Sequence, residues 1–194
     1  MGIDSRTKEI MVGALERNLG YDGGTVVLIG QRWESHLPEE AKPTMDRAFE
    51  LWNELAVVYK EAGVRLFPFA YSPTAIGSTV EPTELLSEKM DVIVNAKGGK
   101  RPDIILAPTA YSLTHTDFMN DWAKRGSRIA TMSNSSLAML SPGGPFDSQE
   151  SPEAIIERTE EIADKLRGSE YVRIGGPNAD LVIHVNRGLV HAST

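Results

Sequence analysis

One stretch of the sequence, residues 102–134, constrains the fold more than any other. A short apolar run at 103–107 is bounded by prolines, a pattern typical of a strand buried in a parallel sheet. A polar turn at 109–116, a helical segment at 117–124 and a second strand at 128–132 follow it. This order of strand, helix and strand predicts an α/β protein whose sheet is mostly parallel.

Hydroxyl-rich turns follow both strands of this stretch, at 109–116 and 133–136. Ligands of open α/β sheets bind at the carboxyl ends of the strands, so we expect a small-ligand site there. We also expect Thr114 to cap the helix that starts at Asp117, with Asp117 in the place of a capping-box acid. The candidate ligand-binding residues are Thr109, Tyr111, Ser112, Thr114, His115, Thr131 and Asn134.

The rest of the chain continues the alternation of strands and helices. Apolar runs at 25–29 and 64–68 predict two further strands. Asp4 or Ser5 is expected to cap the first helix. Together these elements predict a doubly wound, mostly parallel sheet with helices on both faces. The helices predicted from apolar residues at helical spacing cover 5–18, 38–62, 82–97 and 151–166.

The end of the sequence departs from this alternation. Ser151 followed by Pro152 predicts a capped start for the last helix. Two apolar strands, 171–174 and 180–185, flank a Gly-Gly-Pro-Asn turn and predict a β-hairpin. We therefore expect a Rossmann-like α/β domain at 1–169. The hairpin at 170–194 is expected to begin a second domain that the chain lacks.

Composition excludes several classes of protein. The formal net charge is −7, which disfavours binding to a phosphate backbone. Without cysteine, the chain has no disulfide, thiolate zinc site or cysteine nucleophile. No apolar run approaches the roughly 20 residues that cross a bilayer, and the first residues lack the apolar core of a signal peptide. We expect a cytoplasmic protein that binds neither nucleic acid nor membrane.

Two glycine-rich segments are weak candidates for nucleotide binding. The Gly-Tyr-Asp-Gly-Gly segment precedes its strand, whereas a dinucleotide fingerprint follows one. The Gly-Gly-Lys segment at 98–100 lacks the upstream glycine and the following serine or threonine of a P-loop.

The remaining candidate side chains have ordinary structural explanations. His184 and His191, with Asp180 nearby, leave open a metal cluster. Structural hydrogen bonds to backbone or hydroxyl groups explain His115. Arg32 is either an anion contact or a surface residue. Capping and turn roles explain Ser112, Ser133 and Ser135, because no nucleophile-elbow motif surrounds them.

Residues 107–116, with the sequence APTAYSLTHT, and 126–132, GSRIATM, resemble the thermophilic metallo-aminopeptidase family of the aminopeptidase T (leucyl aminopeptidase) type. The 2,5-dihydroxypyridine dioxygenases share the architecture of that family. The helix that contains Thr159 and Leu166 and the hairpin from Val172 onward are also similar. The resemblance covers nearly the whole chain, but only the amino-terminal half of a family member.

The resemblance implies a role without catalytic residues or metal ligands in this chain. In the family, a carboxyl-terminal domain holds the paired metal ions, so zinc, cobalt or iron is expected there and no cofactor here. The amino-terminal domain would cover that active site, support dimerisation and be inert alone. We leave two alternatives open: a stand-alone ligand- or protein-binding module or non-catalytic subunit, and part of a ring-cleaving dioxygenase. A second copy or a partner subunit is expected to cover the hairpin.

Overall fold

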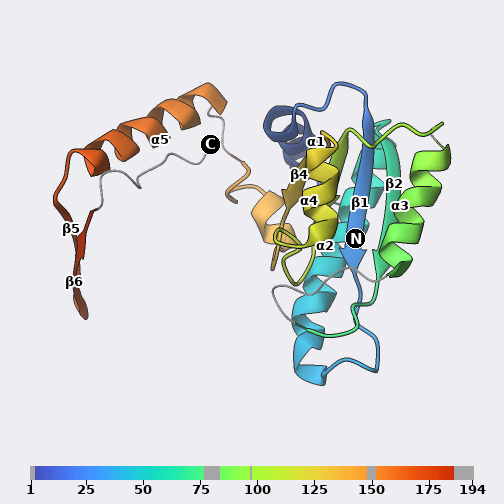
Figure 1. The fold of residues 1–194 in the computed structure, drawn as a ribbon, viewed down its shortest axis with the longest axis horizontal. Coiled ribbons are helices and arrows are strands. Elements are labelled where there is room, and N and C mark those ends of the chain that lie inside the picture. The colour runs from blue at the N-terminus through green and yellow to red at the C-terminus, as the bar shows by residue number, and fades with distance from the viewer. Residues whose placement is uncertain (1–2, 77–83, 97, 148–151, 186–194) are drawn as a thin grey trace. The chain divides into compact units, whose positions relative to one another are not determined.

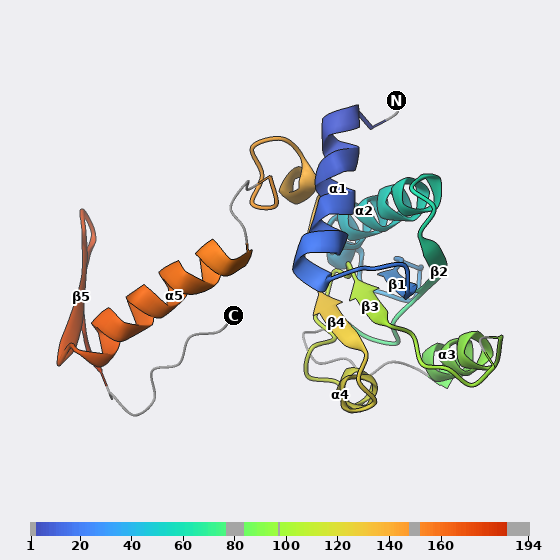
Figure 2. The same ribbon diagram turned by 90° about the horizontal axis from the view of Figure 1, so that it is seen from above.

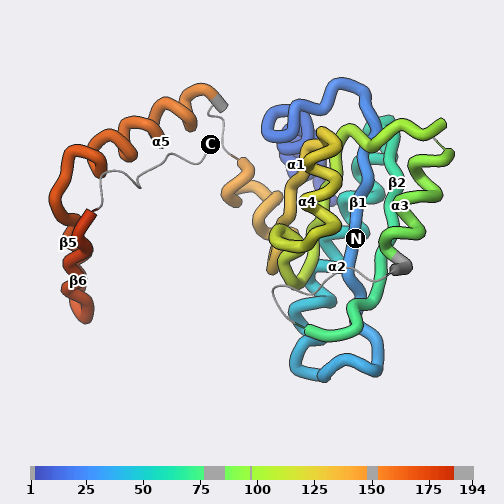
Figure 3. Tube along the Cα trace, in the orientation of Figure 1, coloured from blue at the N-terminus to red at the C-terminus, as the bar shows by residue number. Residues whose placement is uncertain are grey.

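The computed structural model describes residues 3–76, 84–96, 98–147 and 152–185 (Figure 1). The chain divides into two compact units, Met1–Ser148 and Gln149–Thr194. The trace in Figure 3 follows the chain through both units. The sequence analysis placed the boundary at residue 169, whereas this division falls before the last helix. The predicted cap at Ser151 and the candidate ligand His191 lie outside the described residues.

A parallel sheet forms the centre of the first unit, which confirms the predicted fold class. Within the described residues it has four strands in the order β2-β1-β3-β4. β2 continues past its predicted end at Pro68 because a proline is tolerated in an edge strand. The strands are β1 (Thr25–Gln31), β2 (Arg65–Tyr71), β3 (Ile104–Ala107) and β4 (Arg128–Thr131).

Helices cover both faces of this sheet, as the alternation of elements predicts. Figure 2 shows α1 and α2 on one side of the strands and α3 and α4 on the other. The helices are α1 (Ser5–Leu19), α2 (Lys42–Glu61), α3 (Glu84–Ala96) and α4 (Asp117–Lys124). A short 3-10 helix, η1 (Glu39–Ala41), precedes α2, so the predicted helix at 38–62 consists of two pieces.

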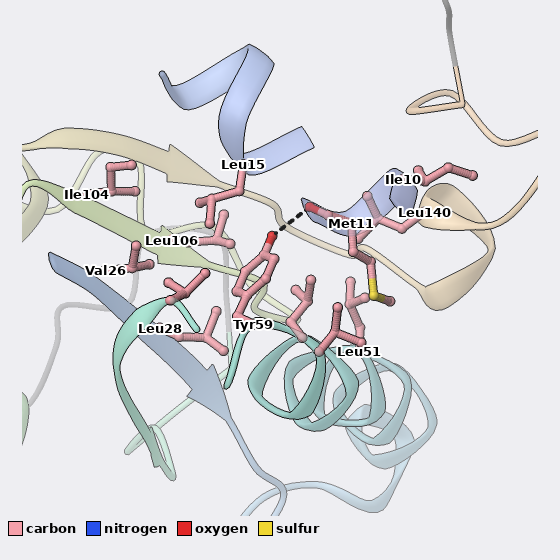
Figure 4. Close-up of a cluster of buried hydrophobic side chains, with 13 residues drawn as sticks. Ile10, Met11, Leu15, Val26, Leu28, Leu51, Tyr59, Ile104, Leu106 and Leu140 are labelled. Carbon is pink, nitrogen blue, oxygen red and sulfur yellow. Dashed lines mark hydrogen bonds between the residues drawn. The ribbon is translucent and has the colours of Figure 1, made fainter. Parts of the chain in front are cut away.

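Two apolar cores result from this arrangement, one on each face of the sheet. All seven residues of β1 are buried, and its side chains alternate between the cores. Val26 and Leu28 pack in the cluster that contains α1 and α2, which Figure 4 shows. Val27 and Ile29 pack in the cluster that contains α3 and α4. The uniformly apolar sequence of this strand therefore reflects burial on both sides.

Polar caps define where two of the helices start. The Asp4 carboxylate accepts a hydrogen bond from the Thr7 amide at 3.0 Å, which confirms Asp4 as the cap of α1. The predicted cap of α4 is wrong, because Thr116 holds that position and accepts from the Met119 amide at 3.3 Å. Thr116 directly precedes the first helical residue, whereas the hydroxyl of Thr114 is hydrogen-bonded elsewhere.

A segment after β4 returns to the first helix. It contains the 3-10 helix η2 (Leu137–Leu140), which was not predicted from the sequence, and a loop follows this helix. The Asp147 carboxylate accepts hydrogen bonds from Arg6 at 2.5 Å and from the Gly143 amide at 2.9 Å. An ion pair between residues distant in sequence thus ties this segment to α1.

The second unit contains one helix and one hairpin. They are α5 (Pro152–Arg167) and the antiparallel strands β5 (Tyr171–Gly176) and β6 (Ala179–His184). The pairing of Gly176 with Ala179 leaves a two-residue turn and confirms the predicted hairpin.

The packing of α5 differs from the prediction. Apolar residues at helical spacing ordinarily face inward, but Ile155, Ile156 and Ile162 are 40–53% exposed. These isoleucines stay exposed because the described part of the unit offers α5 only a two-stranded hairpin and no sheet with a buried face.

The close contact between Gly30 and Trp52 generates a first prediction. A Cβ atom at Gly30 would lie 2.7 Å from the Trp52 ring, which stacks on Phe49 and donates from Nε1 to the Leu28 carbonyl at 3.1 Å. Gly30→Ala is expected to lower the free energy of unfolding by about 1–3 kcal/mol, the usual cost of overpacking a core. Urea denaturation followed by tryptophan fluorescence measures the change.

Gly13→Ala is the matched control for this prediction. The atoms nearest to its added methyl group belong to the flexible end of the Arg17 side chain, and alanine favours the helix. Equal effects of the two substitutions would contradict steric contact with Trp52 as the cause.

The hydrogen bonds to Asp147 generate a second prediction. Those from the Gly143 amide and from Arg6 lower the pKa of Asp147 below its ordinary value of 3.8. The ionised Asp147 carboxylate therefore contributes its full stabilisation above pH 3.8. This stabilisation is lost as the pH falls through the lowered pKa of the folded state. Asp147→Asn is expected to be less stable at neutral pH and to lose less stability in acid. Urea denaturation from pH 6 to pH 2 tests this, and parallel profiles of the two proteins would refute it.

Candidate functional site

The candidate site lies at the carboxyl ends of β1, β3 and β4. After β1 the chain leads through α2 to β2, whereas after β3 it leads through α4 to β4 on the other side. The connections from two neighbouring strands therefore diverge between β1 and β3. In open α/β sheets such a point opens a crevice in which ligands bind.

A buried glutamine occupies this point. Gln31, the last residue of β1, is fully buried. Its Nε2 atom donates to the Tyr71 hydroxyl at 2.8 Å, and its Oε1 atom accepts from the Tyr111 amide at 3.1 Å. One side-chain amide therefore joins the ends of β1 and β2 to the turn after β3. Burial raises the pKa of Tyr71 to about 12, so its phenol remains neutral at physiological pH.

Apolar side chains pack beside this amide. Ala110, in the turn after β3, belongs to a buried cluster with side chains from the connection after β1 and from α2. Tyr111 and Trp33 pack against the same cluster and are partly buried. The crevice is thus occupied by side chains of the chain itself. The buried members of this cluster are Leu37, Ala41, Met45, Ala48 and Ala110.

Two of the predicted site residues hold the turns in place. Thr109 is fully buried and donates from its hydroxyl to the Tyr111 carbonyl at 2.7 Å. Asn134 has a left-handed backbone, with φ at 52°, and its amide donates to the Thr109 carbonyl at 2.9 Å. These contacts join the turn after β3 to the turn after β4. Asparagine is among the residues that adopt this conformation most readily.

Three other predicted residues form a hydroxyl cluster. The Ser112 hydroxyl donates to Thr114 Oγ1 at 2.9 Å, and the hydroxyls of Thr114 and Thr131 share a hydrogen bond. Thr114 is exposed, and the other two are partly exposed. Thr114 and Thr131 also line an open hollow of about 170 Å³ between β4 and α4, together with Met119, Asn120, Ala123 and Ile129. This cluster is the part of the predicted site that solvent reaches.

The three histidines in the described ranges, His36, His115 and His184, do not gather into a metal site. His115 is exposed next to the hydroxyl cluster, and its ring makes no hydrogen bond to the residues that the structure describes, contrary to expectation. His36 Nε2 is 2.9 Å from the Pro73 carbonyl. On the same strand as His184, the Asp180 carboxylate accepts two hydrogen bonds from Arg173, at 2.7 and 2.8 Å. Across the described ranges, no three His, Asp or Glu side chains lie close enough to hold a metal ion.

The remaining candidates have structural partners. Ser135 is buried and donates to the Met132 carbonyl at 2.6 Å, which confirms its predicted turn role. Ser133 is exposed. Arg32 is exposed and forms an ion pair with Glu34 at 2.8 Å.

Sequence reasoning missed Gln31 and Tyr71, the residues that close the crevice. Both lie beyond the predicted ends of their strands, at Ile29 and Pro68. The apolar residues Phe69 and Ala70 continue the strand pattern after the proline, and this signal would have extended β2 to Tyr71.

Comparison with known proteins yields no relative. No protein family, no curated protein and no solved structure matches the chain. Among the helices of the described ranges, none has the length and apolar character needed to cross a membrane.

The two hydrogen bonds of Gln31 generate a third prediction. Gln31→Met keeps the length of the side chain but leaves the Tyr71 hydroxyl and the Tyr111 amide unpaired. A buried polar group left without its partner costs about 1–3 kcal/mol, so we expect a loss of that size for each group. Urea denaturation monitored by circular dichroism measures the loss.

Tyr71→Phe provides the control for Gln31→Met. In the Gln31→Met background, Tyr71→Phe removes one of the unpaired groups and is expected to restore part of the lost stability. Additive losses in the double variant would contradict the pairing of these two side chains.

Proposed function

We propose that this chain is the amino-terminal, non-catalytic part of a cytoplasmic metallo-aminopeptidase-like protein, and that its second unit assembles with a second copy of the chain. The observation that supports the assembly is the apolar surface of that unit, whereas the metallo-aminopeptidase part of the proposal rests on the resemblance of residues 107–116 and 126–132. Eight of the eleven large apolar side chains that are exposed in the described part of the chain belong to it. They are Ile155, Ile156, Ile162, Tyr171, Ile174, Leu181, Val182 and Ile183.

The hairpin has one wholly apolar face and one mixed face, because Tyr171 and Val182 lie on the side that carries Arg173. Its register pairs Val172 with Ile183 and Ile174 with Leu181, so these four side chains share a face. The opposite face carries the ion pair of Arg173 with Asp180. This alternation is the pattern of an antiparallel sheet with one face buried against another element.

The helix α5 adds an apolar stripe of its own. Ile155 and Ile162 lie seven residues apart, which places them on one side of the helix. They are 40% and 53% exposed. A single helix and a two-stranded hairpin bury too little apolar surface to be stable without a covering element.

A second copy of the chain is the occupant that fits this surface best. A standard interface buries roughly 800 Å² on each partner, so a stable contact would need apolar side chains of both α5 and the hairpin. A copy presents the same apolar patch, so a two-fold contact is self-complementary. Dimerisation is also the role that the family resemblance implies for this domain.

The proposed chemistry lies outside this chain. The family resemblance assigns zinc, cobalt or iron to a carboxyl-terminal domain, and the residues described here do not provide a ligand set for such an ion. Dihydroxypyridine-type dioxygenases share the architecture and remain the alternative for the reaction of the whole protein.

Sedimentation of the purified chain tests the assembly. We expect a concentration-dependent dimer, and we expect the double substitution Ile174→Lys with Leu181→Lys to raise its dissociation constant at least about tenfold. The reason is the desolvation cost of a buried, unpaired charge. His184→Lys is the control, because His184 is exposed on the face of the hairpin that carries Arg173 and is not part of the apolar surface. A folded wild-type chain that stays monomeric at 100 μM would refute the assembly.

The same preparations test the catalytic part of the proposal. With zinc or cobalt added, the chain is expected not to hydrolyse a leucine anilide above the rate of the metal alone. Metal-dependent hydrolysis that follows the protein through purification would contradict a non-catalytic role.

A stand-alone ligand-binding module is the second candidate function. The observation in its favour is the hydroxyl cluster of Ser112, Thr114 and Thr131, which borders an open hollow at the strand ends. Such a cluster donates and accepts hydrogen bonds, so it suits a small polar ligand.

A further inference from the structure

A small apolar cavity lies inside the first unit. Its volume is about 80 Å³. It lies beside the core of Figure 4, where α1 and α2 approach β3, β4 and the segment that contains η2. Its lining consists of Ala14, Leu15, Asn18, Leu19, Leu55, Tyr59, Leu106, Ala130, Met132, Leu140 and Phe146.

The cavity has a buried floor and a rim that solvent reaches. The side chains of the floor are at most 3% exposed, and they come from α1, α2, β3 and η2. At the rim, Leu19, Met132 and Phe146 are partly exposed and Asn18 is exposed. A ligand could therefore enter beside Asn18 without unfolding the core. The floor residues are Leu15, Leu55, Tyr59, Leu106 and Leu140.

The floor of the cavity offers water no hydrogen-bond partner. Its one polar side-chain group, the Tyr59 hydroxyl, donates to the Met11 carbonyl at 3.2 Å (Figure 4). Burial raises the pKa of Tyr59 far above its usual value, so this group stays neutral. A buried water needs two to four polar partners, and apolar cavities without them stay dry and take up nonpolar molecules.

Two alanines leave this space open. Ala14 on α1 and Ala130 on β4 both contribute to the lining, where most other positions carry large side chains. A leucine at either position would extend into the cavity. The volume is thus set by two residues that can be changed separately from the floor.

We propose that this cavity binds a short nonpolar group of about three or four carbon atoms, since a cavity of about 150 Å³ holds benzene and this one has about half that volume. An isobutyl group fits this description, with any polar end directed to water beside Asn18. The site is separate from the strand-end hydroxyl cluster, and it does not depend on the proposed function of the chain.

Methyl-resolved NMR of the full chain tests the site with two probes, xenon and isobutanol. Both are expected to cause saturable shifts in the methyl signals of Leu15, Leu55, Leu106 and Leu140. Leu86 and Leu113, in the core on the other face of the sheet, are expected to keep their shifts. Glycerol, which is polar, is expected to cause no saturable shift at the floor. A wild-type chain without saturable shifts at the floor would overturn the proposal.

Substitutions that fill the cavity provide the decisive comparison. Ala14→Leu and Ala130→Leu are expected to abolish the shifts, whereas Ala138→Leu, exposed in η2, is expected to retain them. Binding that survives in both folded, filled variants would overturn the proposal.

If the filled variants do not fold, a variant with an enlarged cavity tests the site instead. Leu140→Ala removes part of the floor and is expected to admit benzene, which the wild-type chain excludes. Exclusion of benzene by this variant, or its binding by the wild-type chain, would contradict the assigned size and place of the site.

Discussion

The first unit depends on a strand that cannot be exposed to water on either face. Every residue of β1 is buried, so the sheet needs an apolar cover on both sides. α1 and α2 provide one cover, and α3 and α4 provide the other. The contact between Gly30 and Trp52 shows how closely α2 approaches this strand. A side chain on either face of β1 is therefore a core side chain, so the strand itself presents none to another molecule.

At the strand ends, structural requirements take up much of the space that a ligand would use. Gln31 completes the hydrogen bonding of Tyr71 and Tyr111, and an apolar cluster packs beside it. Parallel strands end in backbone groups that need partners, and here side chains of the protein supply them. The exposed hydroxyls, the apolar cavity and the surface of the second unit remain free to meet other molecules.

The sequence predicted the fold well because burial of parallel strands leaves a local signal. The run from Thr25 to Ile29 and the apolar spacing of α2 each identify an element without reference to the rest of the chain. The strand-end contacts of Gln31 depend on which strands become neighbours, and no local pattern encodes that. The cap of α4 at Thr116 differs from the prediction by two residues because three hydroxyl residues compete for one short turn. Which side of α5 is exposed depends on what packs against the helix, and the spacing of the helix's own apolar residues does not reveal it.

The ion pair between Arg6 and Asp147 has a consequence for how the first unit could be re-engineered. It brings the beginning of α1 next to the last described residue of the unit, although 141 positions separate the two residues. A domain whose two ends are neighbours in space tolerates circular permutation. A short linker could join these ends, and new termini could be opened in the exposed turn at Gly98 and Gly99 between α3 and β3. The order of the elements along the chain would then change while both cores kept the same side chains.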